Sequence, residues 1–220
     1  MIIIMLGAPA SGKGTQSEVI AERMKIPHIS TGDIFRDNMA RETDIGLKAK
    51  DYINKGLLVP DELTVEILKD RILKADCANG FVLDGFPRTI DQEKVLDKML
   101  AESGKAVDLV LNLKVSDEEI IRRIGGRRMC TCGRTYHTIF NPPKKDNICD
   151  ACGNKLYIRK DDDVSVIATR LATYRQQTEP IVGIYEKKGV LVNIEGEAGQ
   201  NAVTEAIMTR VNECATKCVV

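Results

Sequence analysis

A run of small residues around one lysine is the first feature of this chain that can do chemistry. Residues 7–15 read Gly-Ala-Pro-Ala-Ser-Gly-Lys-Gly-Thr, directly after an apolar segment at residues 2–6. Small residues let consecutive backbone N–H groups converge on phosphate oxygens, and Lys13 can reach the outer phosphates. Gly14 occupies the position where Ser or Thr usually follows the lysine. The loop predicts a nucleoside triphosphate site, with a glycine-rich turn that binds nothing as the alternative.

Asp84 is a candidate partner for the cation that accompanies such phosphates. It follows the apolar segment 81–83, which has the composition of a buried strand. Carboxylate oxygen suits Mg²⁺, which usually keeps several of its waters. We therefore expect Asp84 to hold Mg²⁺ through water.

Four of the seven cysteines are paired closely within a short polar segment. They are Cys130, Cys132, Cys149 and Cys152. A glycine follows each pair, which suits a tight turn around a tetrahedral metal, so the segment predicts a structural Zn²⁺ site. The first pair is one residue shorter than the usual Cys-x-x-Cys spacing, and iron or a reduced site without metal is the alternative. Cys77, Cys214 and Cys218 lack such neighbours and are expected to be ordinary buried or partly buried thiols.

Composition limits the class of protein in which these sites occur. Lys and Arg total 32 against 32 Asp and Glu, so the chain lacks the overall positive charge of a general nucleic-acid binder. No apolar run reaches the length of a membrane span, and residues 1–6 lack the basic lead-in and the length of a signal peptide. We therefore expect a cytoplasmic protein that binds neither nucleic acid nor membrane.

The elements that must position these residues follow an alternating pattern. Short apolar runs occur at residues 2–6, 81–83, 109–113 and 190–194, and long stretches with helical periodicity separate them. Such alternation is typical of a parallel sheet flanked by helices. We therefore predict one three-layer α/β domain with helices on both faces of its sheet.

The second half of the chain departs from this alternation. Residues 125–163 lose the helical periodicity and contain the four paired cysteines, which indicates a small inserted module. Helical sequence resumes at residues 164–188, where Pro180 should kink or divide the helix. A closing helix is expected at residues 201–218.

Further motifs accompany the phosphate loop. Residues 30–36 read Ser-Thr-Gly-Asp-Ile-Phe-Arg, residues 83–89 read Leu-Asp-Gly-Phe-Pro-Arg-Thr, and Gln92 follows shortly after. Three arginines complete the set: Arg127, Arg159 and Arg170. Together these residues resemble the adenylate kinase family, in its long-lid, zinc-binding form, across nearly the whole chain. The resemblance implies a P-loop fold and a monomer that transfers the γ-phosphoryl group of Mg-ATP reversibly to AMP. The products are two ADP, and the role is adenine nucleotide homeostasis.

The same resemblance implies three parts of the chain. The CORE comprises residues 1–29, 60–125 and 163–220, a flap at residues 30–59 covers AMP, and a LID at residues 126–162 carries the zinc. In the family this lid closes over ATP and excludes water that would otherwise hydrolyse it. Function is therefore expected to depend on domain closure.

Site residues carry over from the family wherever this sequence matches it. A positive cage around the transferred group is expected from Lys13, Arg88, Arg127, Arg159 and Arg170. ATP is expected to contact Ala10, Ser11, Gly12, Lys13, Gly14, Thr15, Arg123, Arg127, Thr135, Tyr136 and, through its backbone, Ala198. AMP is expected to contact Thr31, Arg36, Leu57, Leu58, Val59, Gly85, Phe86, Pro87, Arg88, Gln92, Arg159 and Arg170. Arginine suits this work because its planar guanidinium grips phosphate through two hydrogen bonds.

Two acidic residues and both histidines allow simpler interpretations. Asp161 and Asp162 resemble the family's acidic pair that helps the lid to close, with a solvated charge run at residues 160–163 as the alternative. His28 is expected to pack beside a strand. His137 is expected to satisfy a local hydrogen bond in the lid.

Two other functions fit parts of the sequence. Another nucleoside monophosphate kinase, for CMP or UMP, would share the fold and the cage, but Thr31 and Gln92 favour AMP. A zinc-ribbon protein that binds nucleic acid and uses ATP is a more distant alternative. The balanced charge and the few aromatic residues oppose it.

Overall fold

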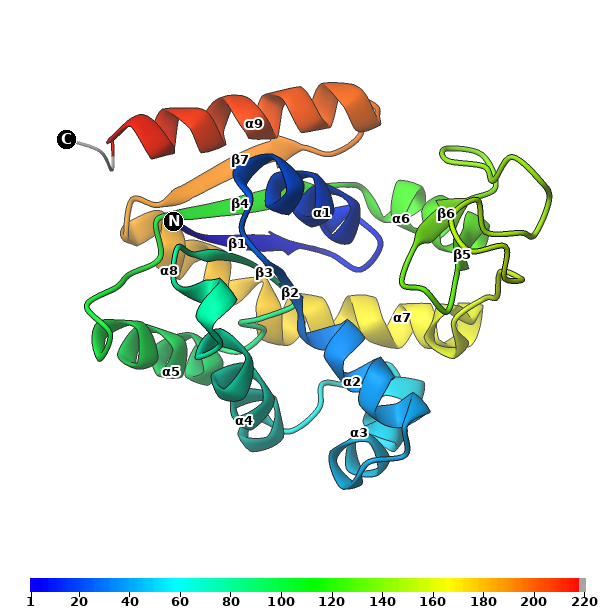
Figure 1. The fold of residues 1–220 in the computed structure, drawn as a ribbon, viewed down its shortest axis with the longest axis horizontal. Helices are drawn as coiled ribbons and strands as arrows, with labels where there is room; N and C mark the ends of the chain where they lie inside the picture. Colours follow the sequence, from blue (N-terminus) through cyan, green and yellow to red (C-terminus); the bar gives the residue numbers. More distant parts are fainter. Residues whose placement is uncertain (218–220) are drawn as a thin grey trace.

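A five-stranded parallel sheet lies at the centre of the computed structural model, which describes residues 1–217 (Figure 1). The strand order is β2-β3-β1-β4-β7. The strands are β1 (Ile2–Gly7), β2 (His28–Ser30), β3 (Phe81–Asp84), β4 (Leu109–Lys114) and β7 (Leu191–Glu195). All residues of the central strand β1 are buried, as expected for a strand with parallel neighbours and helices on both faces. The four predicted strands and the fold class are confirmed.

Alternate side chains of β1 belong to different layers of the core. Ile2, Ile4 and Leu6 share one hydrophobic cluster with residues of α4, α5 and α8, whereas Ile3 and Met5 share another with residues of α1 and α9. Figure 1 accordingly shows α1 and α9 on one side of the sheet and α5 and α8 on the other. These helices are α1 (Lys13–Met24), α4 (Asp61–Ile72), α5 (Ile90–Ala101), α8 (Pro180–Lys187) and α9 (Gln200–Lys217). Because adjacent strand residues point to opposite faces, this pattern builds the three predicted layers.

Two segments extend beyond the carboxyl edge of the sheet (Figure 1). The helices of the first are α2 (Thr31–Ala40) and α3 (Asp44–Asn54), which follow β2. The second follows α6 (Asp117–Gly126) and contains the antiparallel strands β5 (Arg127–Met129) and β6 (Thr135–His137). The 3₁₀ turn η2 (Lys160–Asp162) ends the second segment, whereas the turn η1 (Ala75–Cys77) lies between α4 and β3. The predicted break in the helical pattern at residues 125–163 is confirmed.

Pro180 divides the predicted helix at residues 164–188. The division yields α7 (Val164–Thr173), a π-helical segment η3 (Tyr174–Thr178) and α8, which has the proline in its first turn. Proline has no N–H to donate to the preceding turn, so a helix readily begins there. The closing helix is confirmed as α9. Cys218 lies outside the described residues, so the expectation for its thiol stays a prediction.

One strand was missed. His28 lies beside a strand, as predicted, since it pairs with Val82 of β3, but it is also the first residue of the unpredicted strand β2. With three residues, β2 is too short for an alternating pattern to appear in the sequence. The pairing also brings Ser30 beside Asp84 at the carboxyl edge of the sheet. Among residues 1–217, none of the helices has the length and apolar character needed to cross a bilayer.

Candidate active site

The carboxyl ends of β1, β2 and β3 open into one cavity of about 460 Å³. In open parallel sheets, ligands bind outside these ends, at the point where the strand order reverses. That point lies at β1, which has β3 on one side and β4 on the other. Of the residues predicted to bind nucleotide or Mg²⁺, all line the cavity except Phe86 and Ala198. The structure therefore brings together motifs that lie far apart in the sequence.

The two exceptions have local reasons. Phe86 is 1% exposed and packs in the hydrophobic cluster under α5 and α8, so its side chain supports the segment and does not face a ligand. Ala198 is exposed, and its neighbours Glu197 and Gly199 line the cavity instead. The prediction for Ala198 concerned its backbone, which leaves no signature in the sequence.

The phosphate loop folds tightly around its own lysine. Lys13 Nζ donates hydrogen bonds to the carbonyl oxygens of Gly7 and Ala8, both at 2.7 Å. Gly7 has a φ of 138°, and a Cβ there would lie 2.8 Å from the carbonyl oxygen of Leu113. Helix α1 begins with Gly12 as its N-cap, and no side chain caps it. The backbone N–H groups of its first turn are therefore available to an anion.

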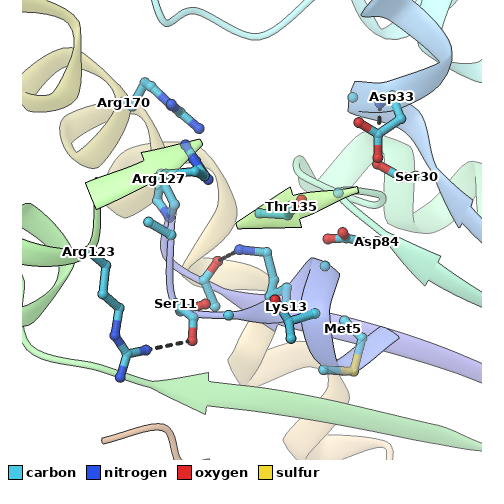
Figure 2. Close-up of a pocket in the computed structure, with 18 of the residues that line it drawn as sticks. Met5, Ser11, Lys13, Ser30, Asp33, Asp84, Arg123, Arg127, Thr135 and Arg170 are labelled. Atoms are coloured by element: carbon cyan, nitrogen blue, oxygen red, sulfur yellow. Dashed lines mark hydrogen bonds between the residues drawn. The ribbon is translucent and has the colours of Figure 1, made fainter. Parts of the chain in front are cut away.

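Burial and neighbouring charges change the pKa of Lys13. Burial lowers the pKa of Lys13 to about 8, because the ammonium group has lost contact with water. Asp84 opposes this effect, whereas Arg88 and two further arginines of the cavity lower the pKa of Lys13 further. Figure 2 shows Lys13, Asp84, Arg127 and Arg170 in this cavity. An anion placed among these cations would raise the pKa of Lys13 again.

Two buried carboxylates hold two of the arginines. Arg127 Nε donates to Asp162 at 2.7 Å, and Arg170 donates to the other oxygen of Asp162 at 3.0 Å. Arg170 also lies 3.2 Å from the carboxylate of Asp161. Asp161 and Asp162 are 8% and 6% exposed. A solvated charge run is therefore the wrong interpretation of these two residues, since both are buried against arginines.

Arg36 and Arg159 share a different carboxylate, that of Asp33. Arg36 donates to Asp33 through Nη2 at 2.6 Å and through Nε at 3.2 Å. Arg159 lies 3.6 Å from the same carboxylate oxygen. Arg88 donates instead to the neutral carbonyl of Gly85 at 2.7 Å, and its burial lowers the pKa of its guanidinium. The cavity thus gathers buried positive charge in a chain whose net charge is zero.

Asp84 has a partner that sequence reasoning missed. His28 Nε2 lies 3.6 Å from the carboxylate of Asp84, an ion-pair distance across neighbouring strands. Burial alone would raise the pKa of Asp84, but His28, Lys13 and Arg88 together hold it below its usual range. Asp84 is therefore ionised at neutral pH, as a carboxylate that holds hydrated Mg²⁺ must be. The pairing of His28 with Asp84 could not be predicted from the sequence, because the strand β2 that contains His28 was not recognised there.

The four paired cysteines form a cluster in the second extended segment. Their sulfur atoms all lie within 4.8 Å of one another, with Cys130 and Cys152 at 3.3 Å and Cys132 and Cys149 at 3.6 Å. Four thiolates at about 2.3 Å from a tetrahedral metal would be separated by about 3.8 Å. A hydrogen bond from Tyr136 lowers the pKa of Cys149 to about 6, which favours the ligating thiolate. The geometry therefore fits a metal.

Cys77, Cys214 and His137 behave as expected. Cys77 is buried and Cys214 is partly buried, and neither forms a disulfide. His137 donates to the carbonyl of Arg123 at 3.0 Å and accepts a hydrogen bond from the backbone N–H of Ile139. The predicted local role of His137 is confirmed.

Phe140 lines the cavity although the sequence did not single it out. Its ring lies 4.9 Å from the guanidinium carbon of Arg122 and 6.0 Å from that of Arg123. It is 43% exposed, so part of its ring is accessible to a ligand in the cavity. Because the inserted segment has no periodicity, nothing in the sequence distinguishes Phe140 from an ordinary loop residue.

Comparison with known proteins agrees with this site. Residues 5–190 match a family model described as adenylate kinase. The chain belongs to the adenylate kinase family. The adenylate kinase of Caldicellulosiruptor bescii is 54% identical over 198 residues, which cover 90% of this chain and 92% of that protein. That of Acetivibrio thermocellus is 52% identical over 213 residues, covering 96% and 98%. That of Lachnospira eligens is 54% identical over 209 residues, covering 94% and 98%. The resemblance seen in the motifs is confirmed.

Inorganic tripolyphosphate tests the electrostatics of this site without a base or sugar. The positive charge of Lys13 is present below its pKa of about 8 and lost above it. We therefore expect the dissociation constant, measured by calorimetry, to rise about tenfold as the pH rises from about 7 to about 9.5. Lys13→Gln should bind tripolyphosphate more weakly at every pH and with a flatter profile. A wild-type profile as flat as that of the variant would contradict the role of Lys13.

Proposed function

We propose that this adenylate kinase transfers the γ-phosphoryl group of Mg-ATP reversibly to AMP, giving two ADP, within the single cavity at the carboxyl edge of the sheet. The observation that carries the proposal is the opposition of two anion sites in that cavity. The phosphate loop with Lys13 forms one, and Thr31, Arg36 and Arg88 line the other. Buried arginines from the second extended segment and α7 line the same cavity. Two polyanions can meet only where such charge offsets their repulsion.

The donor nucleotide would occupy the phosphate-loop side. Backbone N–H groups of residues 10–15 cradle its phosphates, and Lys13 exchanges its carbonyl partners for phosphate oxygens. Arg123 is fixed near this loop by hydrogen bonds to the carbonyls of Ser11 at 3.0 Å and Gly196 at 2.8 Å. Its guanidinium and the ring of Phe140 provide two flat faces for the adenine. Thr135 and Tyr136 line the same side, next to the sugar.

AMP would occupy the flap side. Arg36 and Arg88 grip its phosphate, and Leu57, Leu58 and Val59 enclose its base. Gly85 permits the close approach of Arg88: its φ is 79°, and a Cβ there would lie 2.7 Å from Arg88 Nη2. The hydroxyl of Thr31 donates to the carbonyl of Gly85 at 2.8 Å and thereby ties the flap to this segment. Gln92 reads the base, as the family pattern implies.

Phosphoryl transfer requires alignment and charge neutralisation more than covalent work by the protein. Arg127, Arg159 and Arg170 stabilise the charge on the transferred group, together with Lys13 and Arg88. Mg²⁺, held through water by Asp84, would neutralise the donor phosphates and orient them. The cavity also excludes water once both nucleotides fill it, which suppresses hydrolysis of ATP.

The proposed division of the chain follows from these roles. We assign residues 1–29, 60–125 and 163–220 to the CORE, 30–59 to the AMP flap and 126–162 to the LID. The contact between Arg159 of the LID and Asp33 of the flap supports this division, because it joins the two parts across the cavity. That the protein acts as a cytoplasmic monomer and binds no nucleic acid stays a prediction.

We further propose that the cysteine cluster holds structural Zn²⁺. Four thiolates in this arrangement satisfy a tetrahedral site completely, which leaves no open position for chemistry. Cys130 and Cys149 are buried with Tyr136 and Leu156, so the metal would replace the core that so small a segment cannot otherwise build. The short Cys-x-Cys spacing of the first pair keeps iron as the alternative.

Substrate choice is the direct test of the proposed function. Purified protein with Mg-ATP should produce ADP rapidly with AMP, and more slowly with CMP, UMP, GMP or dTMP at equal concentration. Lys13→Ala should reduce the rate by at least about a thousandfold while the circular dichroism spectrum is unchanged, because the phosphates lose their fixed cation. Preference for another monophosphate would contradict the AMP assignment, and hydrolysis of ATP without an acceptor would contradict the kinase itself.

Metal content and melting temperature test the cysteine cluster. Cys130→Ser should release the metal seen by elemental analysis and lower the melting temperature, since metal binding stabilises the folded segment. The rate at saturating substrate should change less than the stability does. Cys77→Ser, outside the cluster, is the control and should keep the full metal content. Unchanged metal content and melting temperature in Cys130→Ser would contradict a structural metal site at the cysteine cluster.

A further inference from the structure

Gln92 is buried at the edge of the cavity, and both ends of its side-chain amide have partners within the protein. Its Nε2 donates to Asp61 Oδ1 at 2.7 Å. Its Oε1 accepts from the backbone N–H of Arg88 at 2.8 Å. A carboxylate can only accept and a backbone N–H can only donate. The two partners therefore allow one orientation of the amide and exclude the flipped one.

Asp61 is itself held in place. Its second oxygen accepts a hydrogen bond from the hydroxyl of Thr89 at 2.7 Å. Thr89 is the N-cap of α5, and the same hydroxyl accepts from the backbone N–H of Gln92 at 3.1 Å. The carbonyl of Arg88 accepts from the hydroxyl of Thr178 at 2.9 Å. Asp61, at the start of α4, is thus bound by both oxygens to the segment that carries Gln92.

An ordinary explanation for Asp61 is insufficient. An acidic residue in the first turn of a helix is favourable because it faces the positive end of the helix dipole. Glu62 in the same turn can do this as well. Both oxygens of Asp61, however, accept hydrogen bonds from side chains of the segment 89–92 and not from its own helix. The carboxylate of Asp61 is therefore placed to accept a hydrogen bond from the amide of Gln92.

The fixed orientation determines which ligand groups the amide can meet. Each end of a carboxamide offers two hydrogen-bonding positions, and the protein uses one at each end of Gln92. One N–H and one oxygen lone pair are left for a ligand. The six-membered edge of adenine offers the complement, an acceptor at N1 and a donor at the 6-amino group. A 6-oxopurine such as hypoxanthine or guanine reverses both groups and would oppose donor to donor and acceptor to acceptor.

We propose that Asp61 is a positioning residue that sets the purine specificity of the acceptor site: together with the backbone N–H of Arg88, it locks the amide of Gln92 in the orientation that accepts adenine and rejects 6-oxopurines. This inference rests on the proposed function, in which Gln92 reads the base of AMP. Asp61 acts through Gln92 and does not itself touch the nucleotide. Leaving polar groups of a buried site unpaired is the mechanism by which such sites reject a near-identical ligand.

The test compares AMP with IMP as acceptors. IMP carries hypoxanthine, which differs from adenine only at the edge that the amide reads. Asp61→Asn removes the obligatory acceptor and gives Gln92 a partner that tolerates either orientation. We expect the ratio of kcat/KM for AMP to that for IMP to fall at least about tenfold, mainly through a higher KM for AMP. The KM for ATP should change less than about twofold, since the donor side is untouched.

Two further variants serve as controls. Asp91→Asn makes the same chemical change in the first turn of α5, at an exposed residue paired with Lys94, and should leave the ratio unaltered. Asp61→Glu keeps an acceptor-only group and should retain most of the discrimination. If Asp61→Asn does not fold, Asp61→Ala provides the same test, because it also removes the acceptor.

The outcomes separate this inference from the proposed function. A wild-type preference for AMP that Asp61→Asn leaves intact would overturn the role of Asp61 and leave the adenylate kinase assignment standing. An equal fall in kcat/KM for AMP and IMP, with a lower melting temperature, would show that Asp61 merely supports the fold. That result would also overturn the inference. A wild-type protein without preference between AMP and IMP would overturn the reading of the base by Gln92, and the role of Asp61 with it.

Discussion

Like charges gathered in one cavity, away from water, are the constraint on which the rest of this structure depends. Lys13 has a pKa of about 8 and Arg159 one of about 10, both lowered chiefly by burial and then by neighbouring cations. Each cation has lost water and gained a repulsive neighbour, which costs free energy in the substrate-free protein. The same arrangement favours a polyanion, because incoming phosphates find donors already oriented and need not displace bulk water from them.

Carboxylates offset the repulsion between these cations, and each one also fixes the positions of the arginines that it binds. Asp162 joins Arg127 to Arg170 and so connects the start of the inserted segment with α7. Asp33 joins Arg36 to Arg159 across the cavity. Because each carboxylate binds two arginines from different elements, the pairs hold the arginines in their relative positions before substrate arrives. Carboxylate and phosphate both pair with a guanidinium through two parallel hydrogen bonds, so phosphate oxygens can replace these carboxylate partners.

The parallel sheet provides the rigid support for these charges. Three of the functional segments begin where a strand ends: the phosphate loop after β1, the segment with α2 and α3 after β2, and residues 85–88 after β3. A fully buried β1 keeps the loop and Asp84 in register, since Met5 pairs with Asp84 across the sheet. Hydrogen bonds from Thr89 and Gln92 to the carboxylate of Asp61 also connect the starts of α4 and α5. Base recognition and charge neutralisation therefore rest on one framework.

Local signals in the sequence determined much of this protein. The phosphate loop, four of the strands, the division at Pro180 and the cysteine cluster each depend on spacing over a few residues, which local sterics and hydrogen bonding decide. The family's motifs supplied the candidate site, and nearly all of its residues line one cavity. Only the tertiary structure decided which residues contact one another in the site. The strand at His28, the pairing of His28 with Asp84, the burial of Asp161 and Asp162, the exposed face of Phe140 and the link from Asp61 to Gln92 join residues far apart in the chain. Such contacts arise only when separate elements pack together, so no local pattern in the sequence could report them.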